Sequence, residues 1–177
     1  MKRILLIGKN ENKSLEVKNR KASRAIMIKD GLLVMIRSKK YGEYKFPGGG
    51  KKENEFLKET LKREVLEETG FDVIASSIVE FGKVEEVHPD SYEKDKIFKN
   101  LSYYYLCDFI DNGKNKNMDD YEIEYGYEVV FVDIDTAISE NEKVIFKGPT
   151  WVKREIQVLK YIKDNYIIGN NSLIKRG

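Results

Sequence analysis

The chain has 177 residues, and its 32 Lys and Arg against 30 Asp and Glu leave a formal net charge of +2. This length favours a single domain that spans residues 1–177. The near-neutral charge argues against binding nucleic acid or membranes through bulk charge, and 41% hydrophobic residues exclude a disordered chain. A single cysteine, Cys107, and a single histidine, His88, exclude an intrachain disulfide and a zinc site of usual composition, so we expect a cytoplasmic protein with no membrane association.

The N-terminal third alternates short apolar runs with polar segments. Two apolar runs flank Asp30-Gly31, a pair that suits the turn of a β-hairpin. The expected strands are Ile4–Ile7, Ala25–Ile28 and Leu32–Ile36. The expected loops are Lys9–Lys21, which makes residues 1–21 an N-terminal strand and polar loop, and the Lys- and Gly-rich segment Ser38–Glu53.

Helical signals dominate the next segment and return near the end of the chain. We predict a helix over Glu55–Thr69, capped by Asn54 and ended by Gly70. A second helix is expected past Gly148-Pro149, with Val152, Ile156, Leu159, Ile162 and Tyr166 on one face. The remaining elements are expected to be strands within Phe71–Val87, Ile97–Phe109 and Ile123–Ile134, a polar loop over Asp111–Asp120, and a frayed tail over 168–177. This order indicates a mixed sheet with helices packed on it, an α+β fold.

Three acidic residues of the first predicted helix share one face. Glu64, Glu67 and Glu68 are three and four positions apart, so they fall within an arc of about 100°. A solvated acidic edge is the simplest interpretation of such a triplet. Leu57 and Leu61, however, lie along nearly the same direction, so the carboxylates continue an apolar stripe and a cation is expected to face them.

The identity of that cation follows from the chemistry of the ligands. Arg63 is next to Glu64 in sequence and is expected to point about 100° away from it. Several carboxylate oxygens are satisfied better by a hard divalent ion than by one guanidinium group, and oxygen ligands favour Mg²⁺, with Mn²⁺ as the alternative.

Three consecutive glycines precede the helix. Gly48, Gly49 and Gly50 let the backbone approach a ligand closely, and such a loop can present N–H groups to an anion or a carbonyl to a metal. A glycine-rich loop alone is more often a simple turn. Followed by a carboxylate face, it indicates a metal-bound phosphate.

These residues together resemble the signature of a known family. Gly49, then Glu55 after five residues, then Arg63–Phe71 after seven more form a segment that resembles a complete Nudix box. The match covers 23 residues, and the preceding Phe46-Pro47-Gly48 and the order of elements also resemble Nudix hydrolases. The one departure is Thr60, where a small Ala is commonest in the family.

The resemblance implies the Nudix fold, a mixed β-sheet between helices (α/β/α), and a Mg²⁺-dependent pyrophosphohydrolase. It implies that Glu64, Glu67 and Glu68, with the Gly49 carbonyl, hold the metal. It also implies that Arg63 orients these glutamates through Glu55. The partner would be a nucleotide-type small molecule in which a nucleoside diphosphate is linked to another group.

The general base, which removes the proton from water, is either Glu64 or a carboxylate outside the box. The resemblance suggests a further Glu from a late strand, which we expect to be Glu128, as catalyst and metal ligand, or else Glu124. Either residue could instead be an ordinary charged strand residue. Arg37, with Gly48–Gly50, is a candidate for substrate binding, and a solvated loop charge is its alternative.

Other polar and aromatic residues have structural alternatives. We expect core packing for Tyr103–Tyr105, helix-to-sheet packing for Trp151 rather than a base pocket, a loop position for His88 and burial for Cys107.

The substrate remains open among several classes. A nucleoside triphosphate such as 8-oxo-dGTP is the first hypothesis, and dinucleoside polyphosphates, ADP-ribose or nucleotide sugars, and the triphosphate end of RNA are the alternatives. Two other functions are a non-catalytic nucleotide sensor on the same fold and a structural domain with a solvated acidic helix.

Overall fold

The computed structural model describes residues 1–9, 15–90, 93, 95–113, 116–117 and 119–177. The helices in these residues are α1 (Leu57–Thr69), α2 (Asp120–Tyr125), α3 (Ile134–Val144) and α4 (Val152–Asn165), with a 3₁₀ turn at Ala75–Ser77. The strands before α1 are β1 (Arg3–Ile7), β2 (Glu16–Ile26), β3 (Ile28–Lys29), β4 (Leu32–Arg37), β5 (Tyr44–Lys45) and β6 (Gly48–Gly50). The later strands are β7 (Phe71–Val73), β8 (Val79–Pro89), β9 (Lys96–Leu106), β10 (Phe109–Asp111), β11 (Glu128–Val132), β12 (Tyr166–Ile168) and β13 (Leu173–Lys175).

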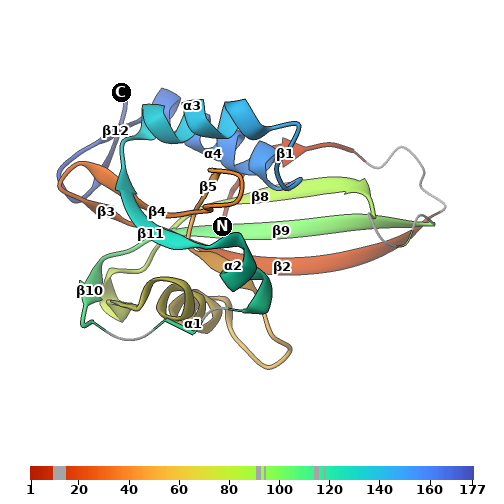
Figure 1. The fold of residues 1–177 in the computed structure, drawn as a ribbon, viewed down its shortest axis with the longest axis horizontal. Helices are drawn as coiled ribbons and strands as arrows, with labels where there is room; N and C mark the ends of the chain where they lie inside the picture. Colours follow the sequence, from red (N-terminus) through yellow and green to blue (C-terminus); the bar gives the residue numbers. More distant parts are fainter. Residues whose placement is uncertain (10–14, 91–92, 94, 114–115, 118) are drawn as a thin grey trace.

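Two sheets form the centre of the molecule. One has the order β1-β8-β9-β2-β6 and mixes parallel with antiparallel pairs, and the other has the order β11-β4-β3, with β5 also paired to β4. Helix α1 lies on one side of the sheets, and α3 and α4 lie on the other (Figure 1). The expected α+β architecture of a mixed sheet between helices is confirmed. None of the helices in the described residues has the length and apolar character needed to cross a membrane.

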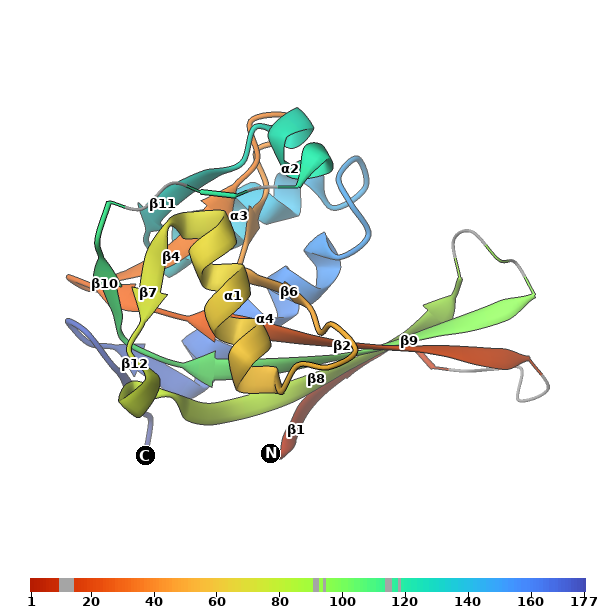
Figure 2. The same cartoon turned by 90° about the horizontal axis from the view of Figure 1, so that it is seen from below.

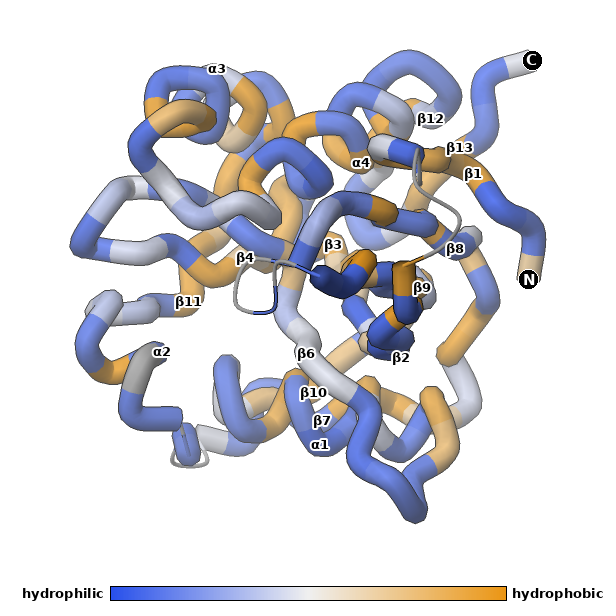
Figure 3. Tube along the Cα trace, turned by 90° about the vertical axis from the view of Figure 1, so that its right-hand side faces the viewer, coloured by the Kyte–Doolittle hydropathy of each residue, from blue (hydrophilic) through white to orange (hydrophobic). Residues whose placement is uncertain are grey.

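Each face of the sheets carries its own hydrophobic core. Ile26 of β2 packs in the core under α3 and α4, whereas its neighbours Ala25 and Met27 pack in the core against α1. This alternation is what a strand covered on both faces requires, because successive side chains point to opposite sides. Apolar segments gather in the body, and the outer loops are mainly hydrophilic (Figure 3).

Strand β2 corrects the expectation of a polar loop over Lys9–Lys21. Its residues 16–21 are exposed, yet their backbone pairs in parallel register with β9, from Glu16 opposite Lys96 onwards. The strands β2, β8 and β9 project together beyond the body as an arm (Figure 2). A strand exposed on both faces has no apolar alternation, so its sequence resembles that of a loop. Residues 10–14 of the expected loop lie outside the described residues.

The box helix begins later than expected. Phe56, not Asn54, precedes its first turn, and the carboxylate of Glu59 accepts a hydrogen bond from the Phe56 N–H at 2.8 Å. Gly70 ends the helix as expected, in the left-handed conformation with φ 77°. The apolar stripe is confirmed, since Leu61 is fully buried.

The C-terminal third contains elements that the sequence did not reveal. The strand expected within Ile123–Ile134 is confirmed as β11, whereas the first residues of that range belong to α2, which was not expected and ends at Gly126 with φ 64°. Helix α3 was not expected, although Asp133 caps it by accepting from the Thr136 N–H. The tail over 168–177, expected to be frayed, contains β13, which pairs with β12, and Asn170 between these strands accepts a hydrogen bond from Gly31. Within the expected loop Asp111–Asp120, residues 114–115 and 118 lie outside the described residues.

The final helix agrees with its predicted apolar face. Val152, Ile156, Leu159 and Ile162 are buried residues of α4, whereas Tyr166, expected on the same face, lies beyond the end of the helix in β12. Tyr104 and Cys107 are buried as expected, but His88 lies in β8, not in a loop.

Candidate active site

Arg63 is the centre of an ion-pair cluster on α1. Its guanidinium group donates to both carboxylate oxygens of Glu55, to Glu64 Oε1 at 2.7 Å and to Glu67 Oε2 at 2.9 Å. The same group donates to the Gly50 carbonyl at 3.1 Å, which ties the helix to the glycine loop. The expectation that Arg63 points away from Glu64 is therefore wrong, because the long side chain brings its head group back to its neighbour.

These contacts perturb the titration of the residues involved. Hydrogen bonding from Arg63 lowers the pKa of Glu55 to about 2, and Glu55 in turn raises the pKa of Arg63. Burial raises the pKa of Glu64, against the opposing effect of Arg63. Arg63 thus holds two of the three box glutamates in fixed positions, and Glu55 holds Arg63.

The Glu64 carboxylate lies directly against the backbone of the glycine loop. A Cβ atom placed on Gly49 would be 2.3 Å from Glu64 Oε2. Only glycine at this position lets the carboxylate approach so closely. Gly48 is constrained differently: it has φ +138°, and a Cβ there would be 2.1 Å from the Ser23 carbonyl oxygen.

Glu68 is the most buried of the three glutamates and has different partners. Its Oε2 accepts from the Gly48 N–H at 2.8 Å, and its Oε1 is 2.6 Å from Lys45 Nζ. Lys45 also contacts Glu122 Oε1 at 3.2 Å, and the carboxyl groups of Glu68 and Glu122 lie within hydrogen-bonding reach. Burial raises the pKa of Glu68 to about 7, and Glu122 adds to this increase while Lys45 opposes it.

The carboxylates of Glu64, Glu67 and Glu68 are therefore all paired with basic side chains of the protein. In this arrangement, no three His, Cys, Asp or Glu side chains of the described residues are grouped so that they could hold a metal ion. Glu64 and Glu67 share Arg63, whereas Glu68 is paired with Lys45. A divalent ion would have to take the oxygens of Glu64 and Glu67 that Arg63 does not contact, and to replace Lys45 on Glu68.

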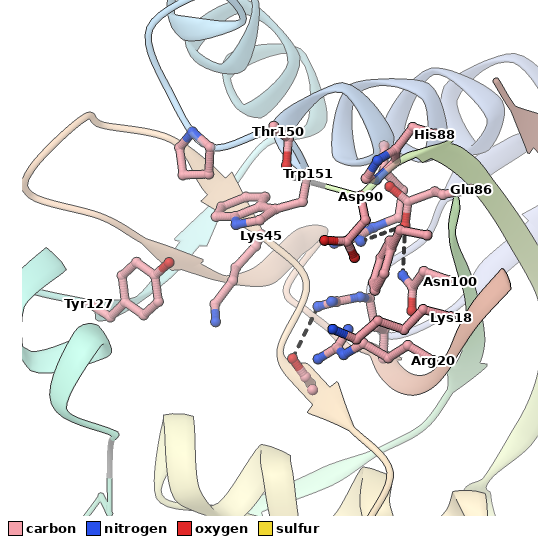
Figure 4. A pocket seen from close by; sticks show the side chains of 16 residues that line it. Lys18, Arg20, Lys45, Glu86, His88, Asp90, Asn100, Tyr127, Thr150 and Trp151 are labelled. Atoms are coloured by element: carbon pink, nitrogen blue, oxygen red, sulfur yellow. Dashed lines mark hydrogen bonds and ion pairs between the residues drawn. The ribbon is translucent and has the colours of Figure 1, made fainter. Parts of the chain in front are cut away.

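A cavity of about 620 Å³ opens beside the glycine loop (Figure 4). Lys45, Tyr127 and Trp151 lie on one side of it, across from Lys18 and Arg20 of β2, and Gly48 and Gly49 also line it. The cavity is lined by the basic residues Lys18, Arg20, Arg24, Lys45 and Arg154 and by the aromatic residues Phe98, Tyr127 and Trp151, together with Gly48, Gly49, Glu86, His88, Asp90, Asn100, Pro149 and Thr150.

Buried charges fix the floor of this cavity. Arg154 is 3% exposed and pairs with Glu86 at 2.9 Å and with Glu155 at 2.6 Å. Arg24 donates to the Gly48 carbonyl at 3.0 Å. The arginine of β2 thereby holds the glycine loop at the edge of the cavity.

Comparison with known proteins identifies the family. A family model described as the NUDIX domain matches residues 18–149, which is most of the chain. The chain belongs to the NUDIX domain family. It is a hydrolase acting on pyrophosphate bonds, with substrates of the nucleotide type.

Solved structures show the same fold at low sequence identity. A NUDIX hydrolase from Nitrosomonas europaea has a TM-score of 0.60 and 16% identity, with 83% of this chain and 90% of that chain covered. A MutT NUDIX hydrolase from Burkholderia pseudomallei has a TM-score of 0.50 and 19% identity, with 67% and 85% covered. A comparison with curated proteins found no match.

The site candidates outside the Nudix box, Glu128, Glu124 and Arg37, have fewer contacts with the box than the residues described above. Glu128 of β11 is paired with Arg37 at 3.3 Å and with Lys39 at 3.4 Å, and about a third of its side chain is exposed. Glu124 is paired with Lys40 at 2.6 Å and is more exposed. Arg37 is not among the residues that line the cavity of this Nudix hydrolase.

Two residues near the box glutamates were missed by sequence analysis. Glu122 is 4% exposed and approaches Glu68 and Glu64 closely enough to raise the pKa of both. Lys45 precedes the glycine loop and is 6% exposed. A lysine among the apolar and glycine residues before the box was the only local signal. Trp151, expected to pack between helix and sheet, lies in the cavity wall instead.

Proposed function

We propose that this Nudix hydrolase is a Mg²⁺-dependent pyrophosphohydrolase that converts a nucleoside triphosphate to the monophosphate and pyrophosphate. The observation that carries the proposal is a cavity with aromatic and basic walls that opens beside the glycine loop, whose backbone lies against the box carboxylates of Glu64 and Glu68. An aromatic ring such as Trp151 suits a nucleobase, and the basic residues suit phosphate oxygens. An oxidised purine such as 8-oxo-dGTP is the first substrate to test.

The residues present fit a divalent ion in their donor chemistry. Glu64, Glu67, Glu68 and the Gly49 carbonyl would hold it through oxygen atoms, as Mg²⁺ or Mn²⁺ prefers. The close approach of Glu64 to Gly49 supports this set, because it brings a carboxylate against a loop backbone that a larger residue would block. When bound, such an ion would neutralise charge on the phosphate oxygens and lower the pKa of a bound water.

The chain's own residues supply positioning and proton transfer. Glu55 anchors Arg63, and Arg63 fixes the carboxylates of Glu64 and Glu67. Arg24 fixes the glycine loop through the Gly48 carbonyl. A carboxylate oxygen of Glu64 would accept the proton from the attacking water, with Glu128 as the second candidate for that role.

A substrate panel with one matched variant tests the proposal. Phosphate and pyrophosphate release would be measured with Mg²⁺ for 8-oxo-dGTP, dGTP, a dinucleoside polyphosphate, ADP-ribose and 5′-triphosphate RNA. We expect Glu67→Gln to lose at least a hundredfold in turnover, about 2.7 kcal/mol in barrier. The control is Glu140→Gln on α3, where an exposed Glu pairs with Lys143 and turnover should not change.

Two results would contradict the proposal. Full Mg²⁺-dependent hydrolysis by Glu67→Gln would remove this residue from the catalytic set. Tight binding of nucleotides without release of phosphate or pyrophosphate from any of them would identify a sensor instead of an enzyme.

A further inference from the structure

Lys45 is a buried cation in contact with two buried carboxylates. Its Nζ atom lies 2.6 Å from Glu68 Oε1 and 3.2 Å from Glu122 Oε1. The same atom is 4.3 Å from the centre of the Tyr127 ring, and Figure 4 shows the Lys45 side chain beside Tyr127. Three elements that are far apart in sequence, β5, α1 and α2, therefore meet at one ammonium group.

The two carboxylates are held in place independently of Lys45. The second oxygen of Glu68 accepts from the Gly48 N–H at 2.8 Å, and the second oxygen of Glu122 accepts from the Asp119 N–H at 3.1 Å. Both side chains are at most 4% exposed. A buried carboxylate requires a cation or hydrogen-bond donors, so Lys45 stabilises a pair that would otherwise repel.

Lys45 therefore occupies an oxygen of Glu68. Under the proposed function, on which this inference rests, Glu68 is one of the glutamates that hold the divalent ion. Two cations compete for this carboxylate. Because Nζ already contacts Glu122, a small tilt of the lysine side chain would leave it paired with Glu122 alone. Glu122 is thus a second anion available to the ammonium group.

We propose that Lys45 is an internal counter-ion that holds Glu68 until a divalent ion replaces it, and that Glu122 then retains the lysine. Lys45 and Glu122 are positioning residues that set the metal affinity of the site. The contact also joins α2 to the box helix through Glu122, so metal binding loosens one of the contacts between these two helices.

The test measures metal binding by the full chain without any substrate. Free Mn²⁺ would be followed by its electron paramagnetic resonance signal, which disappears on binding. We expect Lys45→Met to bind Mn²⁺ at least tenfold more tightly than the wild type, a change of about 1.4 kcal/mol. In EDTA the same variant should melt at a lower temperature, because two buried carboxylates have lost their cation.

Lys40→Met is the matched control. Lys40 pairs at 2.6 Å with Glu124 of α2, the helix that also carries Glu122, and lies 4.6 Å from the Tyr125 ring, but unlike Lys45 it is exposed. Its Mn²⁺ dissociation constant should stay within twofold of the wild-type value. Lys45→Gln, which is neutral but can still donate a hydrogen bond, replaces Lys45→Met if that variant does not fold.

Glu122→Gln tests the second half of the inference. Without Glu122 as an alternative anion, Lys45 should remain on Glu68, so the variant should bind Mn²⁺ more weakly than the wild type. The double variant Lys45→Met with Glu122→Gln should bind as tightly as Lys45→Met alone. The contrary result is a double variant that binds Mn²⁺ more weakly than Lys45→Met, by the same factor by which Glu122→Gln weakens binding in the wild type. That result would overturn this half, because Glu122 would then be a metal ligand.

The outcomes separate this inference from the proposed function. Wild-type protein that binds Mn²⁺, with Lys45→Met binding no more tightly, would overturn the inference alone. Absence of Mn²⁺ binding by both proteins would overturn the proposed function, and the inference with it.

Discussion

Replacement of Gly49 by alanine tests how closely the glycine loop and the box helix are fitted. The added Cβ would be 2.3 Å from Glu64 Oε2, whereas ordinary contact begins at 3.4 Å, so one of the two must move by 3.4 − 2.3, about 1.1 Å. Gly49 does not have a positive φ, so alanine suits its backbone and the clash is the main perturbation. The Glu64 side chain is the part that can move.

The magnitude follows from what Glu64 would lose. Its charged hydrogen bond to Arg63 at 2.7 Å is worth about 2 kcal/mol, and its loss should lower the melting temperature by about 4–8 °C for a domain of this size. A displacement of about 1 Å in a catalytic group can cost about a hundredfold in rate. We therefore expect Gly49→Ala to remain folded and to lose about a hundredfold in turnover.

A glycine outside the site provides the control. A Cβ on Gly169, between β12 and β13, would be 3.1 Å from Ser172 Oγ, the end of a side chain that can shift. Thermal unfolding and pyrophosphate release would be measured for Gly49→Ala, Gly169→Ala and the wild type. If Gly49→Ala kept turnover within twofold of the wild type at an unchanged melting temperature, the packing of Glu64 against the loop would play no part in catalysis.

Three further predictions concern carboxylates. Glu43 is fully buried, neither of its oxygens has a hydrogen-bond partner among the described residues, and burial raises its pKa. Because the folded-state pKa is raised, wild-type stability should fall as the pH rises from about 4.5 through that value, and Glu43→Gln should be more stable by about 1–3 kcal/mol at pH 8 but not at pH 4 in urea denaturation. A difference independent of pH would contradict this, because it would show that the pKa of Glu43 is the same in the folded and unfolded states. Arg63 lowers the pKa of Glu55 to about 2, so the stability that Glu55 contributes is present above pH 4.5 and is lost as the pH falls towards 2. Glu55→Gln should make the free energy of unfolding depend less on pH in this range, and it should reduce turnover because it releases Arg63. An unchanged acid transition would contradict this. For Glu128→Gln, a role in proton transfer predicts at least a tenfold loss in kcat, about 1.4 kcal/mol, whereas unchanged kcat would leave Glu128 as a surface partner of Arg37.

Local sequence patterns predicted the parts of the fold that depend on local contacts. The box helix, its exit at Gly70 and the apolar face of α4 are encoded within a few turns, so their patterns are visible in sequence. The arm is different. Residues 16–21 of β2 form a strand because their backbone pairs with β9, about 80 residues away, and both faces meet water. A polar loop was expected because residues exposed on both faces show no apolar alternation in the sequence.

The candidate site divides in the same way. Glu64, Glu67 and Glu68 share a helix face by spacing alone, and the family resemblance assigned them a role. The reach of Arg63 to Glu64 depends on rotamers, which helical spacing does not describe. The contacts of Lys45 with Glu68 and Glu122 cross 23 and 77 positions of sequence, so only the folded chain brings them together.

The central claim is that the box glutamates hold a divalent ion beside the glycine loop. The most direct measurement is anomalous scattering from a crystal soaked with Mn²⁺ and a non-hydrolysable nucleoside triphosphate. We expect a manganese peak among the carboxylates of Glu64, Glu67 and Glu68, with the phosphates against Gly48–Gly50. A bound nucleotide with no manganese at these carboxylates, and with Glu68 still paired to Lys45, would contradict it.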